Sequence, residues 1–339
     1  MTVVPLADVW GCVPIHEAPQ PQASARGLYN REMLFITETE VRELLPMAKA
    51  IELMEGLFNR LAAGESLNHP RRRLILPSGS VLHYMAGADG AYFGTKIYSS
   101  HPKHGAHFVF LLYRSADATP LAILEANYLG QIRTGAASGY ATKLLAREDA
   151  VTLGVIGSGF QAQTQIAAMR AVRPIRQVKV WSRSDEKRRN FARECDAIAA
   201  PSAEEAVRGA DIVVTATNSR EPVLADAWIQ PGTHVNAMGS NQAQRRELPG
   251  ELILRADLIA VDSLEQARME SGDLLLALEP DRWGRNIVEL KDVRSRPSTA
   301  AVTIFKSNGI AAEDVASAGY VYERALAEGR GKETEVLAG

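Results

Sequence analysis

Cysteine is scarce in this 339-residue chain, and that scarcity already excludes some classes of protein. Only Cys12 and Cys195 are present, so neither a disulfide framework nor a cysteine-based zinc site is expected. No apolar run approaches the ~18 residues of a membrane span, and the N-terminus lacks the basic, apolar and small-residue pattern of a secretion signal. The formal net charge of −2 gives no indication of a nucleic-acid or acidic-membrane partner. We therefore expect a cytoplasmic protein with no membrane or nucleic-acid partner.

The length and composition are those of a two-domain globular protein. Hydrophobic residues make up 46% of the chain and charged residues 23%. Single cores seldom grow beyond about 250–300 residues. Prolines within residues 1–32 break any hydrophobic periodicity, and residues 20–25 have the composition of flexible coil. We predict a detachable N-terminal extension over 1–32, followed by two folded domains.

Residues 33 to about 130 have the pattern of an α+β domain. A strand is predicted over 33–36, after which Thr37 and Glu40 have the spacing of a helix capping box. A helix is predicted from about residue 48 to 63, with Gly64 ending it. Strand-like runs follow at 68–76, 81–85, 93–98 and 108–113, the first two joined as a β-hairpin. This order predicts a mostly antiparallel sheet with a helix.

From residue 132 the pattern changes to alternating helices and strands. A helix is predicted over 133–145, and a last helix over 310–327 is expected to pack back on the first domain. The predicted strands between them are 151–156, 177–181, 211–217, 234–238 and 258–262. This alternation indicates a Rossmann-type, doubly wound parallel sheet, whose ligands bind outside the carboxyl ends of the strands. The loops expected to share that rim begin at Gly157, Ser182, Thr217 and Gly239.

The first of these strands leads into a Gly-x-Gly-x-x-Ala turn and then a helix, the order of a dinucleotide-binding fingerprint. Gly157 permits the tight bend, Gly159 lets the backbone approach a pyrophosphate, and Ala162 allows close packing of helix on strand. The helix N-terminus would offer unpaired N–H groups and a positive dipole end to the phosphates. Glycines also mark ordinary turns, but here strand, turn and helix occur in the required order. We therefore predict a bound dinucleotide.

The end of the second strand indicates which dinucleotide is bound. NAD-binding turns place an acidic residue about 20 residues beyond the third glycine, where it accepts from the ribose hydroxyls. In this chain that position is Ser182, with Arg183 next and Lys187 nearby. Serine does not repel a 2′-phosphate and Arg183 can pair with one, so NADP(H) is favoured over NAD(H). The alternative is that Arg183 and Lys187 lie on the solvated start of a helix.

Several further segments complete a set of motifs in a fixed order. They are 94–96 with 101–103, 133–138, 232–241 with 246–248, 270–273 and 303–314. With them the chain resembles the ornithine cyclodeaminase/μ-crystallin family from residue 33 to about 330. The resemblance implies a homodimer whose first domain supplies the substrate site and the dimer contact. It places an extension at 1–32, a substrate-binding and dimerisation domain at 33–130 and 308–339, and a Rossmann dinucleotide-binding domain at 131–307.

Cationic side chains of the first domain are the candidate substrate ligands. The resemblance places Lys96 in the substrate pocket, where it could bind a carboxylate. It could also protonate an imine nitrogen, if burial and nearby cations lower its pKa. The alternative is a surface lysine at a strand end. One arginine of 71–73 should clamp the substrate carboxylate bidentately. Counting back from Met85 favours Arg72, and a one-residue shift in the hairpin would give Arg71 instead.

The resemblance also implies other site residues. His83 lies where cyclodeaminases carry a glutamate, and it could orient the substrate or Arg72, or simply pack. Arg133 and Thr134 resemble the family's contacts to phosphate and nicotinamide, with plain helix capping as the alternative. The predicted cofactor-binding residues are Arg133, Thr134, Gly157, Ser158, Gly159, Gln161, Ser182, Arg183, Thr217, Met238 and Ser307. Asp262 and Asp273 are interpreted as structural.

Two further positions depart from the family pattern. Cyclodeaminases of the family place an aspartate, acting as a base, where this chain has Asn241. Asparagine can form hydrogen bonds but cannot take up a proton at neutral pH, which puts ornithine cyclisation in doubt. Hydride transfer needs less of this position because the cofactor carries the chemistry, so Asn241 stays a catalytic candidate beside Lys96 and Arg72. Gly130 stands where many relatives have threonine.

Together these residues predict an NAD(P)H-dependent oxidoreductase that acts on the C–N bond of a small 2-amino or 2-imino acid. The substrate carboxylate would dock on Arg72 and Lys96, and Lys96 or a water would supply the proton of the nitrogen. Two alternatives stay open. One is a cyclodeaminase that releases ammonia and recycles bound NAD. The other is a non-catalytic NADPH-binding protein like μ-crystallin. The presence of Lys96 disfavours this second alternative.

Overall fold

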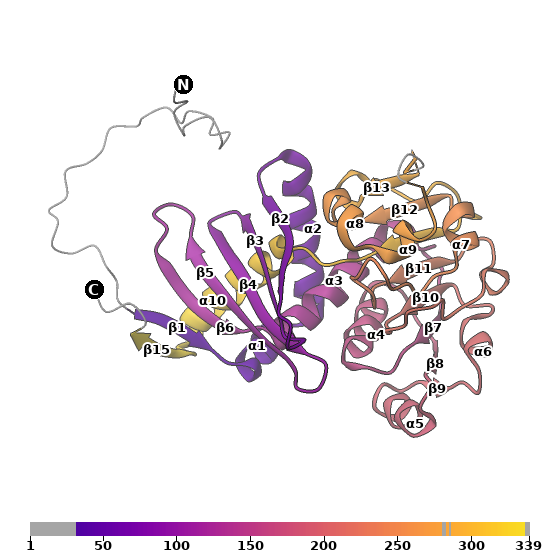
Figure 1. Cartoon of the computed structure of the whole chain (residues 1–339), viewed down its shortest axis with the longest axis horizontal. Helices are drawn as coiled ribbons and strands as arrows, with labels where there is room; N and C mark the ends of the chain where they lie inside the picture. Colours follow the sequence, from indigo (N-terminus) through magenta and orange to yellow (C-terminus); the bar gives the residue numbers. More distant parts are fainter. Residues whose placement is uncertain (1–31, 280–282, 285, 336–339) are drawn as a thin grey trace, which may run out of the picture. The chain divides into compact units, whose positions relative to one another are not determined.

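The computed structural model describes residues 32–279, 283–284 and 286–335, and the chain from residue 31 onward forms one compact unit (Figure 1). Of the extension predicted over 1–32, all but the last residue lies outside the described residues. The described part contains two β-sheets and the helices that pack on them. None of its helices combines the length and the apolar character that crossing a membrane requires.

The first sheet has seven strands. They are β1 (Glu32–Ile36), β2 (Leu67–Ile75), β3 (Val81–Asp89), β4 (Tyr92–His101), β5 (Gly105–Arg114), β6 (Pro120–Glu125) and β15 (Lys332–Glu335). Their order across the sheet is β15-β1-β6-β5-β4-β3-β2. Every neighbouring pair is antiparallel except β1 and β6, so the predicted mostly antiparallel sheet is confirmed. The sequence patterns did not predict β6 and β15.

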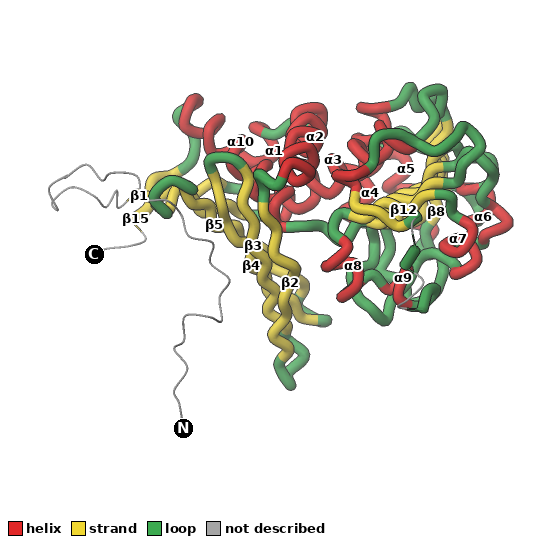
Figure 2. Tube along the Cα trace, turned by 90° about the horizontal axis from the view of Figure 1, so that it is seen from above, coloured by secondary structure: helices red, strands yellow, loops and turns green. Residues whose placement is uncertain are grey.

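Three helices lie on one side of this sheet (Figure 2): α1 (Glu38–Leu44), α2 (Met47–Ala63) and α10 (Ala311–Glu328). Thr37 and Glu40 form the predicted capping box of α1. Helix α2 ends at Gly64, whose φ of 75° is the left-handed conformation that glycine adopts without strain. Helix α10 packs on β3 and β4, as predicted. On the other side of β3, the side chains of Leu82 and Tyr84 are 39% and 47% exposed.

The second sheet has eight strands. They are β7 (Thr152–Ile156), β8 (Gln177–Trp181), β9 (Ile198–Ala199), β10 (Ile212–Thr215), β11 (His234–Ala237), β12 (Leu258–Val261), β13 (Ile287–Glu289) and β14 (Thr303–Lys306). Their order is β13-β12-β14-β11-β10-β7-β8-β9, and each described pairing is parallel. The predicted doubly wound, Rossmann-type sheet is thereby confirmed. The chain order reverses between β7 and β10, where such sheets bind their ligands.

Helices accompany the second sheet and join it to the first. They are α3 (Asn127–Leu145), α4 (Phe160–Val172), α5 (Asp185–Glu194), α6 (Ala203–Val207), α7 (Gly250–Arg255), α8 (Leu264–Glu270) and α9 (Gly272–Leu275). Helix α3 begins at Asn127, earlier than predicted, and contacts strands of both sheets. A Cβ on Gly135 would lie 2.7 Å from the carbonyl oxygen of Thr164, so glycine lets α3 approach α4 closely. The domain boundary predicted at 130/131 falls within this continuous helix.

Candidate active site

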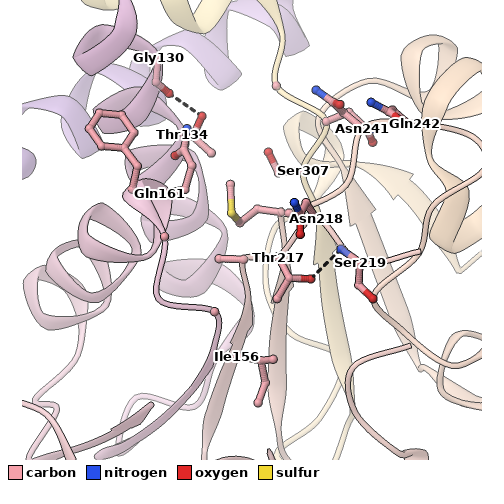
Figure 3. Close-up of a pocket in the computed structure, with 18 of the residues that line it drawn as sticks. Gly130, Thr134, Ile156, Gln161, Thr217, Asn218, Ser219, Asn241, Gln242 and Ser307 are labelled. Atoms are coloured by element: carbon pink, nitrogen blue, oxygen red, sulfur yellow. Dashed lines mark hydrogen bonds between the residues drawn. The ribbon is translucent and has the colours of Figure 1, made fainter. Parts of the chain in front are cut away.

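A pocket of about 1200 Å³ is lined by residues from both sheets. The loops after β7, β8, β10 and β11 reach it at Gly157, Ser182, Thr217 and Gly239, so these carboxyl ends share one rim as predicted. Figure 3 shows Thr134 of α3 and Gln161 of α4 on one side of the pocket, with Asn241 and Ser307 on the other. The pocket is therefore formed where the dinucleotide-binding rim meets the first sheet.

All predicted site residues except Arg72 line this pocket. They are Arg71, His83, Lys96, Arg133, Thr134, Gly157, Ser158, Gly159, Gln161, Ser182, Arg183, Thr217, Met238, Asn241 and Ser307. These residues come from segments that are distant in sequence, from β2 to the loop after β14. The fold thus brings the predicted substrate ligands and the predicted cofactor ligands to one place, while their roles stay predictions.

The glycine turn after β7 leaves room for a dinucleotide. Gly157 has a φ of 117°, and a Cβ there would lie 2.3 Å from the carbonyl oxygen of Ala216, so only glycine fits. At Gly159 an added Cβ would meet no atom within 4 Å and would project into open space. No side chain caps α4, whose first N–H groups follow directly after Gly159. Such groups bind phosphate oxygens, so the turn fits the pyrophosphate of a dinucleotide.

The end of β8 presents hydroxyl and basic groups to the same pocket. The hydroxyl of Ser182 lies 2.8 Å from that of Ser158, and the Ser182 carbonyl accepts from Arg188 Nη1 at 2.7 Å. Arg183 and Lys187 line the pocket beside them. A negatively charged group, such as a phosphate on the ribose of the dinucleotide, can therefore be accommodated beside Arg183 and Lys187.

Basic side chains line the pocket, whereas none of the described lining residues is an aspartate or a glutamate. The lysines and arginines of the lining are Arg71, Lys96, Arg133, Arg183 and Lys187. The carboxylates that balance several of them lie behind, in α8 and α10. A site of this kind attracts ligands that carry several negative charges, such as a dinucleotide and a carboxylate substrate.

Two adjacent carboxylates of α10 hold two of these cations. Lys96 Nζ lies 3.0 Å from Asp314 Oδ1, and Arg133 donates through Nε to the same oxygen at 3.1 Å. Arg133 Nη1 also donates to Glu313 Oε2 at 2.8 Å, and all four residues are buried. Burial lowers the pKa of Lys96 to about 8, with Asp314 opposing the shift and Arg133 and Arg71 adding to it. A pKa lowered by burial and nearby cations is what a proton donor at Lys96 requires.

Arg71 faces the pocket and Arg72 does not, which corrects the preference for Arg72. A β-bulge shifts the pairing of β2 with β3 between His69 and Arg72, so that Arg72 lies opposite the exposed Tyr84. Because side chains alternate along a strand, Arg71 points to the opposite face, where it lines the pocket and is only 4% exposed. The register of a bulged strand cannot be counted from the sequence.

Glu270, at the end of α8, holds Arg71 and Arg73 from the side of the second sheet. It pairs with Arg71 Nη1, and its other oxygen lies 2.6 Å from Arg73 Nη2. Arg73 Nη2 also donates to the carbonyl oxygen of Asn241 at 2.9 Å, which ties the Asn241 loop to β2. The contact of Glu270 with Arg71 was not predicted from the sequence. Glu270 belongs to the matched segment 270–273, but its partner Arg71 lies 199 positions away.

His83 is a neutral side chain at this pocket. Its ring stacks on Tyr98 with centroids 4.1 Å apart, and Nε2 lies 2.9 Å from Ser100 Oγ. Burial lowers the pKa of His83 to about 4, and the charges of Arg73 and Arg71 add to the shift. His83 can therefore hydrogen-bond a substrate, but it does not add a cation to the site at neutral pH.

Glu247 is a buried carboxylate that ties together the loops after β10 and β11. It accepts from the N–H of Thr217 at 2.6 Å and from the N–H of Gly239 at 2.7 Å. Asp273 accepts from the N–H of Glu247 at 2.6 Å and lies 3.2 Å from Lys306 Nζ. Burial raises the pKa of Glu247 to about 7, with Asp273 adding to the shift. Asp273, interpreted from the sequence as structural, contacts backbone N–H groups and Lys306, whereas the contacts of Glu247 and Lys306 were not predicted.

The fold and this set of residues agree with a comparison against known families. The model of the ornithine cyclodeaminase/mu-crystallin family matches residues 31–329. This chain belongs to the ornithine cyclodeaminase/mu-crystallin family. The resemblance inferred from its motifs is thus confirmed, and the match covers nearly the span inferred from the sequence.

Several known proteins are similar to this chain over their whole length. Delta(1)-pyrroline-2-carboxylate reductase of Bacillus cereus is 36% identical over 325 residues, which cover 89% of this chain and 100% of that protein. A structure of the Thermococcus litoralis delta(1)-pyrroline-2-carboxylate reductase in complex with NADH and L-proline has a TM-score of 0.84 and 31% identity, covering 89% of this chain and 100% of that one. An archaeal alanine dehydrogenase dimer with bound NAD has a TM-score of 0.85 and 33% identity, covering 90% of this chain and 100% of that one.

Proposed function

We propose that this protein is an NADP(H)-dependent oxidoreductase that interconverts a small 2-imino acid and the corresponding 2-amino acid. The observation that carries this proposal is the meeting of two sets of groups in one pocket. Arg71 and Lys96 of the first sheet line the same pocket as the glycine turn after β7. The relatives named for pyrroline-2-carboxylate reduction and alanine dehydrogenation support the substrate class.

Each of the pocket's own groups has a part in this proposal. Arg71 binds the substrate carboxylate, for which a guanidinium fork held by Glu270 is well suited. Lys96 provides a second positive charge and the proton of the substrate nitrogen. The bound dinucleotide supplies the hydride. Asn241 and His83 can form hydrogen bonds at the pocket, and neither carries a charge at neutral pH.

The test is a screen for NADPH oxidation, monitored through the absorbance of the nicotinamide. Candidate substrates are pyrroline-2-carboxylate, piperideine-2-carboxylate, and 2-oxo acids supplied with ammonia or methylamine. Imino-acid-dependent NADPH oxidation is expected. Ammonia release from ornithine or lysine without net change in nicotinamide absorbance would instead identify a cyclodeaminase. Tight NADPH binding with no turnover of any of these compounds would point to a non-catalytic binding protein.

The preference for NADP(H) over NAD(H) is part of the proposal. It is supported by Ser182, which adds no charge, and by Arg183 and Lys187, which line the pocket at the end of β8. A 2′-phosphate can pair with these cations. Binding titrations with NADPH and NADH should give a lower Kd for NADPH, and equal or reversed affinities would refute the preference.

We further infer that the protein forms a homodimer through the open side of the first sheet. That side exposes apolar side chains of three strands, with Leu74, Leu82, Tyr84 and Val109 all at least 39% exposed. A row of exposed apolar residues of this kind is typical of an interface. The dimeric state of the archaeal alanine dehydrogenase supports the inference. Tyr84→Asp should shift the mass measured by light scattering toward that of the monomer. An unchanged mass would mean that this side of the sheet is not the dimer interface.

A further inference from the structure

The contact between Lys96 and Asp314 joins the first sheet to the beginning of α10. Lys96 Nζ lies 3.0 Å from Asp314 Oδ1, and the two residues are 3% and 0% exposed. The second carboxylate oxygen of Asp314 has no hydrogen-bond partner among the residues that the structure describes. A buried carboxylate of this kind keeps its charge only through the cations beside it, here Lys96 and Arg133.

Gly130 makes the contact possible. Its position on α3 faces Lys96, and a Cβ there would lie 2.4 Å from Lys96 Nζ. Any larger residue would therefore push the lysine ammonium from its present place. Because the obstructed atom is the end of a flexible side chain, the lysine can move and the helix need not. Gly130 thus allows the position that Lys96 takes against Asp314.

Residue 241 is an asparagine, so no carboxylate at this position can exchange a proton with the substrate nitrogen. Asn241 lines the pocket, and its neighbour Gln242 is also an amide (Figure 3). Asp314 is the carboxylate that contacts Lys96 directly. Glu313, its neighbour on α10, contacts Arg133 instead.

We propose that Asp314 is a positioning residue that holds Lys96 as the protonated donor for the substrate nitrogen, and that Gly130 provides the space which this pair requires. The inference rests on the proposed function and adds the residues that hold the proton donor in place. In imine reduction the C=N bond becomes a C–N bond. Its carbon gains the hydride that the coenzyme supplies, and its nitrogen gains a proton from Lys96 Nζ. Lys96 becomes a neutral amine and recovers its proton from water, while Asp314 stays ionised throughout.

The charges around Lys96 determine the pH dependence. The groups that face Lys96 are Asp314 of α10, Arg133 of α3, Arg71 of β2 and the ring of Phe108 on β5, whose centroid is 5.5 Å from Nζ. Burial raises the pKa of Asp314, but Arg133 and Lys96 outweigh it and the net shift is downward. Asp314 is therefore ionised wherever Lys96 titrates. The donor form of Lys96 is lost as pH rises through about 8, so turnover in the reductive direction should fall there.

The first test is the pH profile of kcat for imine reduction in Asp314→Asn. Removing the carboxylate charge leaves burial, Arg133 and Arg71 unopposed, so the alkaline limb should move to lower pH by about 1–3 units. Glu313→Gln is the matched control. It removes the adjacent buried carboxylate, which pairs with Arg133 and not with Lys96. Burial raises the pKa of Glu313 to about 8, so this variant also tests whether Glu313 causes the limb; if Lys96 causes it, the alkaline limb should stay in place. Equal movement in both variants, or in neither, would overturn the proposal.

A second measurement does not depend on turnover. NMR titration of the protein with isotope-labelled lysine, with the Lys96 signal assigned from Lys96→Met, reports the ionisation of the ammonium directly. Both Asp314→Asn and Gly130→Ala should lower its titration midpoint, the second by moving the ammonium away from the carboxylate. If no imino acid is reduced, the proposed function fails while this titration still tests the pair. If turnover is present and neither variant shifts the midpoint, only this inference fails.

Discussion

The side of the pocket proposed to bind the dinucleotide and the side proposed to bind the substrate are built from different kinds of contact. At the rim of the second sheet, the groups proposed to bind the pyrophosphate belong to the backbone: Gly157 and Gly159 shape the turn, and α4 presents uncapped N–H groups. At the first sheet they are side chains, whose placement depends on partners such as Asp314, 218 positions from Lys96. The first kind of site needs only local sequence, whereas the second needs the complete fold. Substitutions on the two sides should therefore have separable effects.

The largest effect is expected on the substrate side, from Lys96→Ala. Loss of a general acid typically costs about 10²–10⁴-fold in rate, so kcat for imine reduction should fall by that amount. NADPH affinity, measured by fluorescence titration, should change little because Lys96 belongs to the first sheet and the glycine turn to the second. Lys103→Ala, on the exposed turn between β4 and β5, is the control. Parallel loss of NADPH binding and turnover in Lys96→Ala would erase the distinction between the two sides.

Arg71→Ala and Arg72→Ala sharpen the comparison within one strand. A charge-assisted hydrogen bond is worth about 1.5–3 kcal/mol, so Arg71→Ala should raise KM for the imino acid by about 10–100-fold. Glu270 keeps Arg73 as its partner, which should preserve the fold. Arg72→Ala should leave KM unchanged, because Arg72 lies on the other face of β2. A larger increase in KM from Arg72→Ala than from Arg71→Ala would instead support Arg72 as the residue that clamps the carboxylate, as preferred from the sequence.

On the dinucleotide side, two neighbouring glycines should behave differently. Gly159→Ala places a methyl group where no protein atom lies within 4 Å, so the thermal midpoint should hold. NADPH Kd should rise by about tenfold, or about 1.4 kcal/mol, because the methyl group obstructs the pyrophosphate. Gly157→Ala should instead lower the thermal midpoint, since it clashes with the Ala216 carbonyl and holds a positive φ. Unaltered binding in Gly159→Ala would place the phosphates elsewhere.

The smallest effect is expected from Arg183→Ala. Its side chain is exposed, so its pairing with a 2′-phosphate is screened by solvent and worth about 0.2–1 kcal/mol. The ratio of NADPH to NADH affinity should fall by about 1.4- to fivefold. Arg189→Ala, an exposed arginine of α5 outside this pocket, is the control. If the ratio is unchanged, either Lys187 causes the preference for NADPH or there is no such preference.

Local patterns predicted much of the second sheet and its rim. The Gly-x-Gly turn, the strand β7 before it and the helix α4 after it are contiguous, so their geometry follows from adjacent residues. Ser182 and Thr217 were placed at the rim because parallel strands end on one edge. The strand β15 was missed because a short edge strand has little signal of its own. Helix α3 was predicted to begin too late, since it is buried on almost all sides and has no polar face to mark its period.

On the substrate side, local sequence patterns were not sufficient to predict the site. Lys96 and the arginine run were recognised through the family resemblance, but alternation along a strand could not choose between Arg71 and Arg72 across an unseen β-bulge. Glu270 and Asp314 lie in recognised motifs, yet no spacing in the sequence connects them to Arg71 and Lys96. Their pairing, and the pKa of Lys96 that follows from it, depend on contacts made only when the chain has folded.

The sequence by itself determined the class of fold, the family and the dinucleotide turn, because these depend on periodicity, glycine conformation and the order of contiguous motifs. Only the tertiary structure decided which arginine faces the pocket and which carboxylate holds the lysine. It also decided that the pocket presents cations while their counter-charges lie behind them. The physical reason is that electrostatic interactions depend on distance through the folded protein, and burial removes the water that would otherwise screen them.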